Sequence, residues 1–545
     1  MATPTTLRIT IDHAIRMVKH PALLAELKKR LSFPNPAREA LARRGRPPGR
    51  VPETWCAVES SEGSGEVVVP RGALPHVIEA CKAVGVAPEW QARVTFDRDA
   101  RVTPLDQLAV QGRDYQVEAV ERCASQRQGV VCLPCGGGKT MVGALLVAHL
   151  GQRAVVCCPT TDIRDQWVET LKRVSGGKLR IRVIGGDVDW SGAPLLSGEV
   201  AVGVDDSLAN ERAVPLLRSA GLAIFDECHR LASKTWRAIV SVCAARWRIG
   251  LTATPERADG WDLLLPILLG PVLLERSQKW LVEHGYLSQP TVYPVAVPTL
   301  SSAGDFVYRV TCQTCGRETS VDPDKVKTGL LKCKTTIGRG SKRDVCNAPI
   351  AGDAQVSKTF NTGKAGSRVA KDPARVGLVL GMVRWAHARG RVVLVLLGRV
   401  SAVPVLVREL AGHGIEAVGL TGKEPRPKRA EALRRVRAGH VRVVVATTVA
   451  DEGLDLPEAD TLVSANPGKA SGATTQRVGR ICRPKGLEPL VFDVVDGGSN
   501  YARQWSARSS AYRKAYGDVA VPHRRPLSWS EVLAVVERKQ GKVAR

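Results

Sequence analysis

Pro134–Thr140 reads Pro-Cys-Gly-Gly-Gly-Lys-Thr and follows the apolar run Val130–Leu133, which is typical of a buried strand. A glycine-rich turn exposes backbone N–H groups to phosphate, and the lysine ammonium adds a positive charge. The threonine hydroxyl that follows is an oxygen ligand of the kind that Mg²⁺ prefers. We therefore predict that this turn binds the phosphates of a nucleotide.

A second segment supplies two acids after an apolar strand pattern, Ala223–Glu227. A bound metal needs a carboxylate, and the attacking water needs a group that positions it. The two segments, in this order along the chain, together predict nucleoside triphosphate hydrolysis.

Composition favours a polyanionic partner. The chain has 545 residues with 79 Lys plus Arg against 53 Asp plus Glu, giving a formal charge of +26 and a pI near 9.8. An arginine-rich composition is also what a GC-rich genome produces, but beside a nucleotide motor the excess charge favours nucleic acid. The 14 cysteines mostly stand singly or in strand patterns, which indicates a reducing compartment rather than disulfides.

Membrane and secretory classes are disfavoured by the apolar pattern. The longest apolar run, Leu263–Leu274, is interrupted by prolines and is too short to span a bilayer, and no signal pattern stands at the start. We expect a cytoplasmic protein without a membrane partner, associated with the nucleoid if it is bacterial or phage-encoded.

Strand and helix patterns alternate in two separate regions, which predicts an α/β fold with two doubly wound parallel sheets. The predicted divisions are an N-terminal accessory domain (1–105) that is a candidate for DNA binding, a first α/β domain (106–288), a second α/β domain (289–498) with a cysteine-rich insertion (300–365), and a basic tail (499–545). Within the accessory domain, Ile15–Leu31 has helix-like patterning. The tail has two interpretations, packing on the second core or extending a basic surface.

Further short motifs occur in a fixed order on both sides of the first two: Arg113–Gln116, Cys158–Thr161, Asp206–Leu208, Asp226–His229, Leu251–Pro255, Leu420–Lys423, Ala446–Asp455 and Gln476–Arg483. This series resembles superfamily 2 DNA helicases and translocases of the DEAD/DEAH-box type. Pro134–Thr140 and Thr254–Gly260 are most similar to the XPB/UvsW branch. The resemblance covers about residues 106–498 and implies two RecA-like domains, use of ATP with magnesium, and 3′-to-5′ movement along a strand.

The resemblance also implies roles for individual residues. The catalytic residues would be Lys139, Glu227, Arg480 and Arg483. Nucleotide and magnesium would be bound by Gln116, Gly136, Gly137, Gly138, Lys139, Thr140, Asp226, Asp451, Gly453 and Gln476, with Thr140 and Asp226 at the metal. Nucleic-acid backbone would be contacted by Pro159, Thr160, Ser207, Arg399, Thr421 and Thr447.

Two positions depart from the family pattern, and three hydroxyls have a competing interpretation. Position 133 is Leu where the strict phosphate-binding motif has Gly, and Asp205–Asp206 places acid beside Ser207. Thr160, Thr421 and Thr447 are also explained by ordinary strand-end or helix-cap hydroxyls.

Four cysteines in the insertion predict a zinc site. Cys312 and Cys315 form a close pair, and Cys333 and Cys346 follow at wider spacing. Four thiolates from two arms suit a closed tetrahedral Zn²⁺ site, although the second pair lacks the usual Cys-x-x-Cys knuckle. The alternative is four unpaired thiols in a flexible loop. The basic surroundings indicate either a DNA-contacting wedge or a solvated insertion.

These observations together predict an ATP-dependent DNA helicase or translocase that acts on single-stranded, duplex or branched DNA in repair, recombination or replication. One alternative is an enzyme that unwinds RNA or RNA–DNA hybrids, because motors that read the backbone carry few marks of sugar type. Another is a motor subunit of a defence or transcription assembly that moves duplex without separating strands. The sequence identifies no protein partner.

Overall fold

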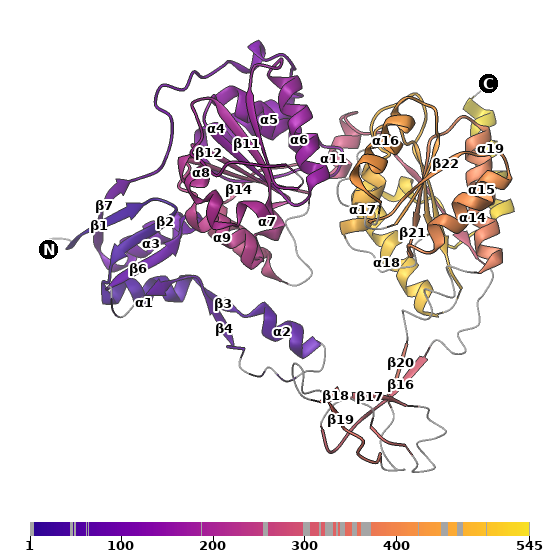
Figure 1. Cartoon of the computed structure of the whole chain (residues 1–545), viewed down its shortest axis with the longest axis horizontal. Coiled ribbons are helices and arrows are strands. Elements are labelled where there is room, and N and C mark those ends of the chain that lie inside the picture. The colour runs from indigo at the N-terminus through magenta and orange to yellow at the C-terminus, as the bar shows by residue number, and fades with distance from the viewer. Residues whose placement is uncertain are drawn as a thin grey trace. The chain divides into compact units, whose positions relative to one another are not determined.

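The computed structural model describes residues 5–543 apart from 44–46, 48, 50, 61–62, 64, 187, 254–259, 298–305, 316–317, 322–330, 334–335, 338–343, 351–356, 361–371, 423, 448–455, 466–471 and 498. The chain divides into two compact units (Figure 1). The first takes in the described residues of Met1–Ser288 together with Thr475–Pro484. The second takes in those of Gln289–Asp451, Leu456–Thr474 and Lys485–Arg545.

The first unit begins with a small α/β domain. Its five-stranded sheet has the order β5 (Glu59–Ser60), β6 (Glu66–Pro70), β2 (Ala14–Val18), β1 (Thr5–Ile11) and β7 (Val86–Ala92). The other elements are α1 (Pro21–Arg30), β3 (Ser32–Pro34), α2 (Pro36–Arg43), β4 (Thr54–Cys56) and α3 (Leu74–Val84). Its hydrophobic core includes Ile267 from α10 (Leu264–Leu269), so this domain packs directly on the element that follows β13 (Trp247–Thr252) of the neighbouring sheet.

The prediction of one helix over Ile15–Leu31 is wrong at its start. Ala14–Val18 is the strand β2, in which β-branched Ile15 pairs with Val69 of β6. The helix begins only at Pro21, whose fixed φ suits the first turn, and the side chain of His20 caps it by accepting from Leu23 N at 3.3 Å. Apolar spacing alone does not separate a short strand followed by a helix from a longer helix.

The central sheet of the first unit is seven-stranded and wholly parallel. Its order is β10 (Arg180–Ile184), β11 (Glu199–Val204), β9 (Ala154–Cys158), β12 (Leu222–Asp226), β13, β8 (Gln128–Cys132) and β14 (Val272–Glu275). Helices cover both of its faces (Figure 1): α4 (Asp114–Gln126), α5 (Lys139–Leu150), α6 (Thr161–Val174), α7 (Asp205–Leu208), α8 (Val214–Ser219) and α9 (Lys234–Val242). The inner strands β11, β9 and β12 are accordingly buried along their whole length, as their sequences predict. The short helix α11 (Gln278–Glu283) follows β14.

The second unit repeats this architecture with six parallel strands. The order is β15 (Thr291–Ala296), β25 (Leu490–Val495), β24 (Thr461–Ala465), β21 (Val393–Leu397), β23 (Val443–Thr447) and β22 (Ala417–Leu420). Its helices are α14 (Pro373–Ala388), α15 (Ala402–Gly412), α16 (Arg426–Arg437), α18 (Ser499–Tyr516) and α19 (Trp529–Val543). The helix α17 (Gly472–Gly479) begins in this unit, and its residues from Thr475 onward belong to the first unit. The predicted α/β class with two doubly wound parallel sheets is confirmed.

The C-terminal helices belong to the second core, which decides between the two interpretations of the tail. Arg508 of α18 forms a buried ion pair with Asp493 of β25 at 2.7 Å, and Tyr512 donates to the same carboxylate at 2.8 Å. Val532 and Val536 of α19 lie in the hydrophobic core of this unit. These helices therefore complete the fold instead of extending it as a free basic segment.

The described residues between β15 and α14 form two small antiparallel sheets. One consists of β17 (Glu318–Val321), β16 (Phe306–Thr311) and β20 (Ser357–Phe360), and the other is a hairpin of β18 (Thr336–Ile337) and β19 (Asp344–Val345). Among the helices of the described residues, none combines the length and apolar character that crossing a bilayer requires.

Candidate active site and cysteine cluster

The glycine-rich turn connects β8 to α5 at the carboxyl edge of the first sheet. Gly136 and Gly138 have φ of +83° and +78°, a region that side chains disfavour. A Cβ on Gly138 would lie 2.3 Å from Nε2 of Gln116. The turn is thus a close-fitting loop that leads into the N-terminus of α5, where backbone N–H groups and the helix dipole favour an anion. This geometry fits a nucleotide phosphate.

The Leu at position 133 has a structural explanation. Leu133 is buried, and its backbone N–H donates to Thr252 O at 3.0 Å, which extends the pairing of β8 with β13. Its φ lies outside the positive range that favours glycine. A large apolar side chain is therefore compatible with the conformation of this glycine-rich turn.

Two residues at the start of α4 support the turn from outside. The Tyr115 hydroxyl donates to Gly137 O at 2.8 Å, and the Gln116 amide donates to the same carbonyl at 3.3 Å. The Gln116 carbonyl accepts from Arg113 N at 3.0 Å. The proposed reading of adenine by Gln116 stays a prediction.

The two acids stand at the end of β12, beside Lys139. Asp226 is only 4% exposed, and one of its oxygens accepts from Glu227 N at 3.0 Å. Lys139 Nζ lies 3.8 Å from Glu227 Oε1 and 3.4 Å from Leu133 O. The lysine and both carboxylates therefore converge at the edge of the sheet where the glycine turn presents its N–H groups. This donor set fits Mg²⁺ with a phosphate.

Burial and neighbouring charges move the pKa values of these groups apart. Burial, followed by the charge of Glu227, raises the pKa of Asp226. Burial also opposes the charge on Glu227, but Lys139 and His229 outweigh it and lower the pKa of that carboxyl. For Lys139, burial lowers the pKa, yet the attraction of Glu227 prevails and raises it. Glu227 is therefore ionised at neutral pH, as an acceptor of a proton must be.

His229 links the acidic segment to β13. Its Nδ1 lies 3.2 Å from the hydroxyl of Thr252 and 3.4 Å from Glu227 Oε2. The backbone of Glu227 has a φ of +52°, so the chain turns sharply directly after the strand. This turn directs Glu227 and His229 to the same place at the end of the sheet.

The segment Thr475–Pro484 packs against the glycine-rich turn within the first unit. A Cβ on Gly479 would lie 2.9 Å from Cys135 O, and a Cβ on Gly136 would lie 3.1 Å from Gly479 O, so both positions need glycine. Gln278 Nε2 donates to Thr475 O at 3.3 Å. The positive charge of Arg480 reaches Lys139 and opposes the rise of its pKa. Gln476 and Arg483 are half-buried on the same segment.

The predicted nucleic-acid residues follow strand ends in both sheets. In the first unit, Pro159 follows β9, Thr160 caps α6 by accepting from Ile163 N at 3.3 Å, and Ser207 lies in α7. Asp205 beside it accepts from the indole N–H of Trp236 at 2.7 Å, so its carboxylate is directed into the protein.

In the second unit, Arg399 follows β21, Thr421 follows β22, and Thr447 ends β23. The hydroxyl of Thr421 donates to Glu424 Oε1 at 2.7 Å, whereas that of Thr447 is buried and makes no hydrogen bond within the described part of the chain. The predicted positions Asp451 and Gly453 lie outside the described residues.

Trp167 is a residue that sequence reasoning missed. Its indole N–H donates to Asp226 Oδ2 at 2.7 Å, and its side chain is 0% exposed. Tyr115 and His229 were missed as well, although each stands beside a predicted residue in a quoted motif. Trp167 offers no such signal, since an apolar pattern in a helix predicts only burial.

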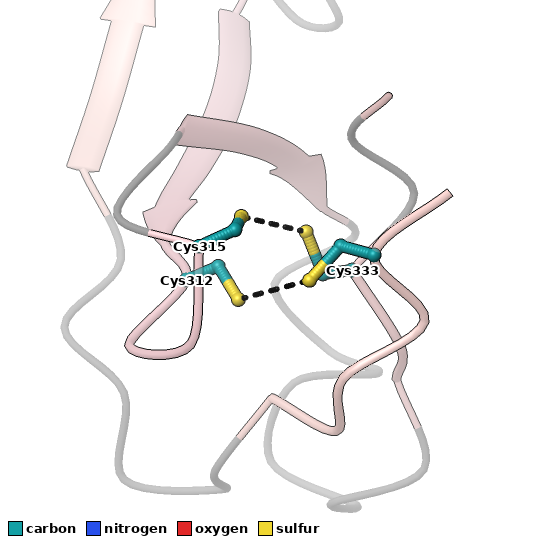
Figure 2. A group of neighbouring side chains, drawn as sticks. Cys312, Cys315 and Cys333 are labelled. Carbon is teal, nitrogen blue, oxygen red and sulfur yellow. Dashed lines mark hydrogen bonds between the residues drawn. The ribbon is translucent and has the colours of Figure 1, made fainter. Parts of the chain in front are cut away.

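The four cysteines of the insertion come together in the second unit. The sulfur of Cys312 lies 3.8 Å from that of Cys346, and the sulfur of Cys315 lies 3.8 Å from that of Cys333. All four sulfurs lie within 4.8 Å of one another. Figure 2 shows the side chains of Cys312, Cys315 and Cys333 directed toward a common centre. All 14 cysteines of the chain are free thiols.

Backbone pairing explains how the widely spaced second pair meets. Cys333 N donates to Ala348 O at 2.8 Å, and Asn347 N donates back to Cys333 O at 2.9 Å. Asn347 has a φ of +49°, which turns the chain directly after Cys346. The segments that carry Cys333 and Cys346 therefore bring their two sulfurs together as a Cys-x-x-Cys knuckle would, although the two residues are far apart in the sequence.

Comparisons with known proteins give two family matches. Residues 109–257 match the family described as type III restriction enzyme, res subunit, and residues 376–485 match the helicase conserved C-terminal domain. The chain is 27% identical over 409 residues to the DNA 3′-5′ translocase XPB2 of Sulfurisphaera tokodaii, covering 74% of this chain and 85% of the relative. It is 26% identical over 471 residues to the DNA 3′-5′ helicase XPB of Kineococcus radiotolerans, covering 84% and 73%.

Among solved structures, a fragment of an HsdR subunit of a type I restriction enzyme from Vibrio vulnificus is similar, with a TM-score of 0.50 and 15% identity. The similarity covers 77% of this chain and 68% of that one. At this identity it supports the fold alone.

Proposed function

We propose that the chain is a superfamily 2 helicase or translocase, like the families and relatives that it matches, and that it couples ATP hydrolysis to movement along, or unwinding of, DNA. Branched DNA is included among its substrates, and repair, recombination or replication are the proposed settings. The observation that carries the proposal is the meeting of Lys139, Asp226 and Glu227 beside the glycine-rich turn. The relatives named DNA translocase and DNA helicase support DNA as the polymer.

The chemistry assigns a separate task to each side chain. The backbone of Gly136–Gly138 and the ammonium of Lys139 would bind the β- and γ-phosphates. Thr140 and Asp226 would hold Mg²⁺, which when bound neutralises phosphate charge and orients the nucleotide. Glu227 would take a proton from the attacking water. Arg480 and Arg483 would stabilise the charge that develops on the transferred phosphoryl group.

Gln116, Gln476, Asp451 and Gly453 are proposed to contact the nucleotide or to transmit its state. The proposed backbone contacts are Pro159, Thr160, Ser207, Arg399, Thr421 and Thr447. Hydroxyls and strand-end N–H groups suit phosphates and carry no sequence information. In this proposal residues 106–288 and 289–498 are the two motor domains, and residues 1–105 are an accessory domain.

Comparing ATP hydrolysis with single-stranded DNA, duplex DNA, branched DNA and RNA tests the proposal, with a strand-separation assay in parallel. We expect DNA to accelerate hydrolysis and RNA to do so weakly or not at all. The matched control is Lys139→Ala, which removes the phosphate-binding charge. If only RNA stimulates hydrolysis, the polymer on which the protein acts would be RNA instead of DNA. Stimulation by duplex DNA without strand separation would indicate a duplex translocase, and no stimulation by any nucleic acid would contradict a motor function.

We further propose that Cys312, Cys315, Cys333 and Cys346 bind a structural Zn²⁺. Four sulfurs around one Zn²⁺ at about 2.3 Å lie about 3.8 Å apart in a tetrahedron. Both closest sulfur pairs have this separation, whereas a disulfide needs about 2.0 Å. No water or substrate position remains with four protein ligands, which is typical of a structural site.

Elemental analysis of purified full-length protein tests the metal directly. We expect one zinc per chain, lost in the Cys312→Ser/Cys315→Ser variant, while nucleotide binding is retained. Cys243→Ser is the matched control, since this buried cysteine belongs to the core of the first sheet. Wild-type protein purified without any bound metal, and unaltered by a chelator, would contradict the zinc proposal.

A further inference from the structure

We propose that Trp167 is a positioning residue that holds Asp226 in the orientation needed for Mg²⁺ and connects that carboxylate to the start of α6. The inference rests on the proposed function, because Asp226 is assigned to the metal there. It deepens that function by identifying a residue outside the quoted motifs on which metal binding depends.

The first support is the hydrogen bonding of the Asp226 carboxylate. Oδ2 accepts from the Trp167 indole N–H at 2.7 Å, and Oδ1 accepts from Glu227 N at 3.0 Å. With one donor on each oxygen, the carboxylate plane is fixed, and the remaining lone pairs are available to metal-bound water. Hydrogen bonds to metal ligands tune affinity because they fix the orientation of the ligand.

The second support is the close packing of the Trp167 indole ring against Gly143. An ideal Cβ on Gly143, in α5, would lie 2.3 Å from Cη2 of Trp167 and 3.2 Å from Cδ1 of Leu251. The ring therefore occupies a slot between the helix that begins at Lys139 and the strand β13. Because the ring is enclosed and fully buried, its N–H has little freedom to leave Asp226.

The third support is what else α6 carries. Thr160 caps the helix, and Arg164 and Trp167 follow at helical spacings of four and three, so all three lie on one face. Arg164 donates to Gly185 O, and a Cβ on Gly185 would lie 2.3 Å from Oγ of Ser207. One helix thus connects Thr160 and the neighbourhood of Ser207, both proposed nucleic-acid contacts, to Trp167, which lies about 10 Å further along its axis and contacts the metal carboxylate.

The same unit contains a matched interaction that serves as a control. Trp236, in α9, is also buried and donates its indole N–H to Asp205 Oδ2 at 2.7 Å. Trp→Phe at either position removes one indole donor from one carboxylate and leaves an aromatic ring in the core. Only Trp167 reaches the carboxylate that is assigned to the metal.

Metal binding is the decisive measurement, made with full-length protein and a non-hydrolysable ATP analogue. Free Mn²⁺, as a stand-in for Mg²⁺, is quantified by electron paramagnetic resonance. We expect Trp167→Phe to raise the Kd for Mn²⁺ on the order of 10-fold, the loss typical of removing a hydrogen bond to a metal ligand. Trp236→Phe is expected to leave that Kd unchanged. If Trp167→Phe does not fold, Gly143→Ala displaces the same ring without changing it and is expected to raise the Kd as well.

An unchanged Kd in Trp167→Phe, or an equal rise in Trp236→Phe, would overturn the positioning role. The ratio of DNA-stimulated to basal ATP hydrolysis, measured at saturating Mg²⁺, tests the connection to α6. We expect Trp167→Phe to reduce this ratio at least 3-fold, on the order of a weak hydrogen bond, and an unchanged ratio would overturn the connection. Failure of the proposed function is distinguishable, because wild-type protein would then show no DNA stimulation while still binding Mn²⁺.

Discussion

Replacing Gly143 by alanine is expected to destabilise the first unit, although the same change in a helix interior is ordinarily favourable. Gly143 lies within α5, where alanine is intrinsically better than glycine by about 1 kcal/mol. Its new Cβ would, however, stand 2.3 Å from Cη2 and 3.0 Å from Cζ3 of Trp167. Carbon atoms in contact are normally about 3.5–4.0 Å apart, so the ring must move by more than about 1 Å.

Two costs then oppose the helix preference. Overpacking a buried site costs about 1–3 kcal/mol, and losing the hydrogen bond to the Asp226 carboxylate costs about 1.5–3 kcal/mol. After subtracting the gain of about 1 kcal/mol in helix propensity, the expected net loss of unfolding free energy is about 1.5–5 kcal/mol. The cost arises from one fully buried ring and its hydrogen bond, so it depends on the presence of Trp167.

Chemical denaturation of four proteins, wild type, Gly143→Ala, Trp167→Phe and the double variant, isolates this dependence. Phenylalanine lacks the ring atoms that the new Cβ would approach, so Gly143→Ala should cost little in the Trp167→Phe background. Gly377→Ala is the matched control, because Gly377 lies in α14 and a Cβ there would meet nothing within 4 Å. A Gly143→Ala protein as stable as Gly377→Ala, or a penalty that persists without Trp167, would refute the reasoning.

Three further predictions concern catalysis, the second core and nucleic-acid binding. Glu227→Gln removes the proton acceptor, so single-turnover ATP hydrolysis should slow on the order of 10²–10⁴-fold with ATP-analogue affinity retained, and a loss below about 10-fold would argue against that role. Asp493→Ala removes the buried carboxylate that pairs with the Arg508 guanidinium and accepts from Tyr512, so denaturation should show a loss of about 3–5 kcal/mol; less than about 1 kcal/mol would contradict it. DNA affinity measured between about 50 and 200 mM salt should fall steeply as counterions are released, and insensitivity to salt would contradict a phosphate-binding surface.

The local sequence was sufficient to predict the elements that chemistry requires at fixed spacing. The strand before Pro134, the glycines with positive φ and the acids at the end of β12 are properties of a few adjacent residues, and the parallel topology brings strand ends to one edge. The order of strands and the C-terminal helices on the second core depended instead on long-range pairing, such as Arg508 with Asp493. The strand β2, which occupies the start of the helix predicted over Ile15–Leu31, was missed for the same reason, because it is defined by its pairing with β6.

The sequence by itself determined the two parallel-sheet domains, the glycine-rich turn before α5 and the identity of the four clustered cysteines. Tertiary structure alone decided that Cys333 and Cys346 act as one knuckle, because backbone pairing around Asn347 joins residues that their spacing keeps apart. It also decided that Trp167 of α6 donates a hydrogen bond to Asp226 of β12, a contact between two elements that no local sequence pattern predicts. Local preferences depend on neighbours along the chain, whereas a hydrogen bond between distant segments exists only once both have packed.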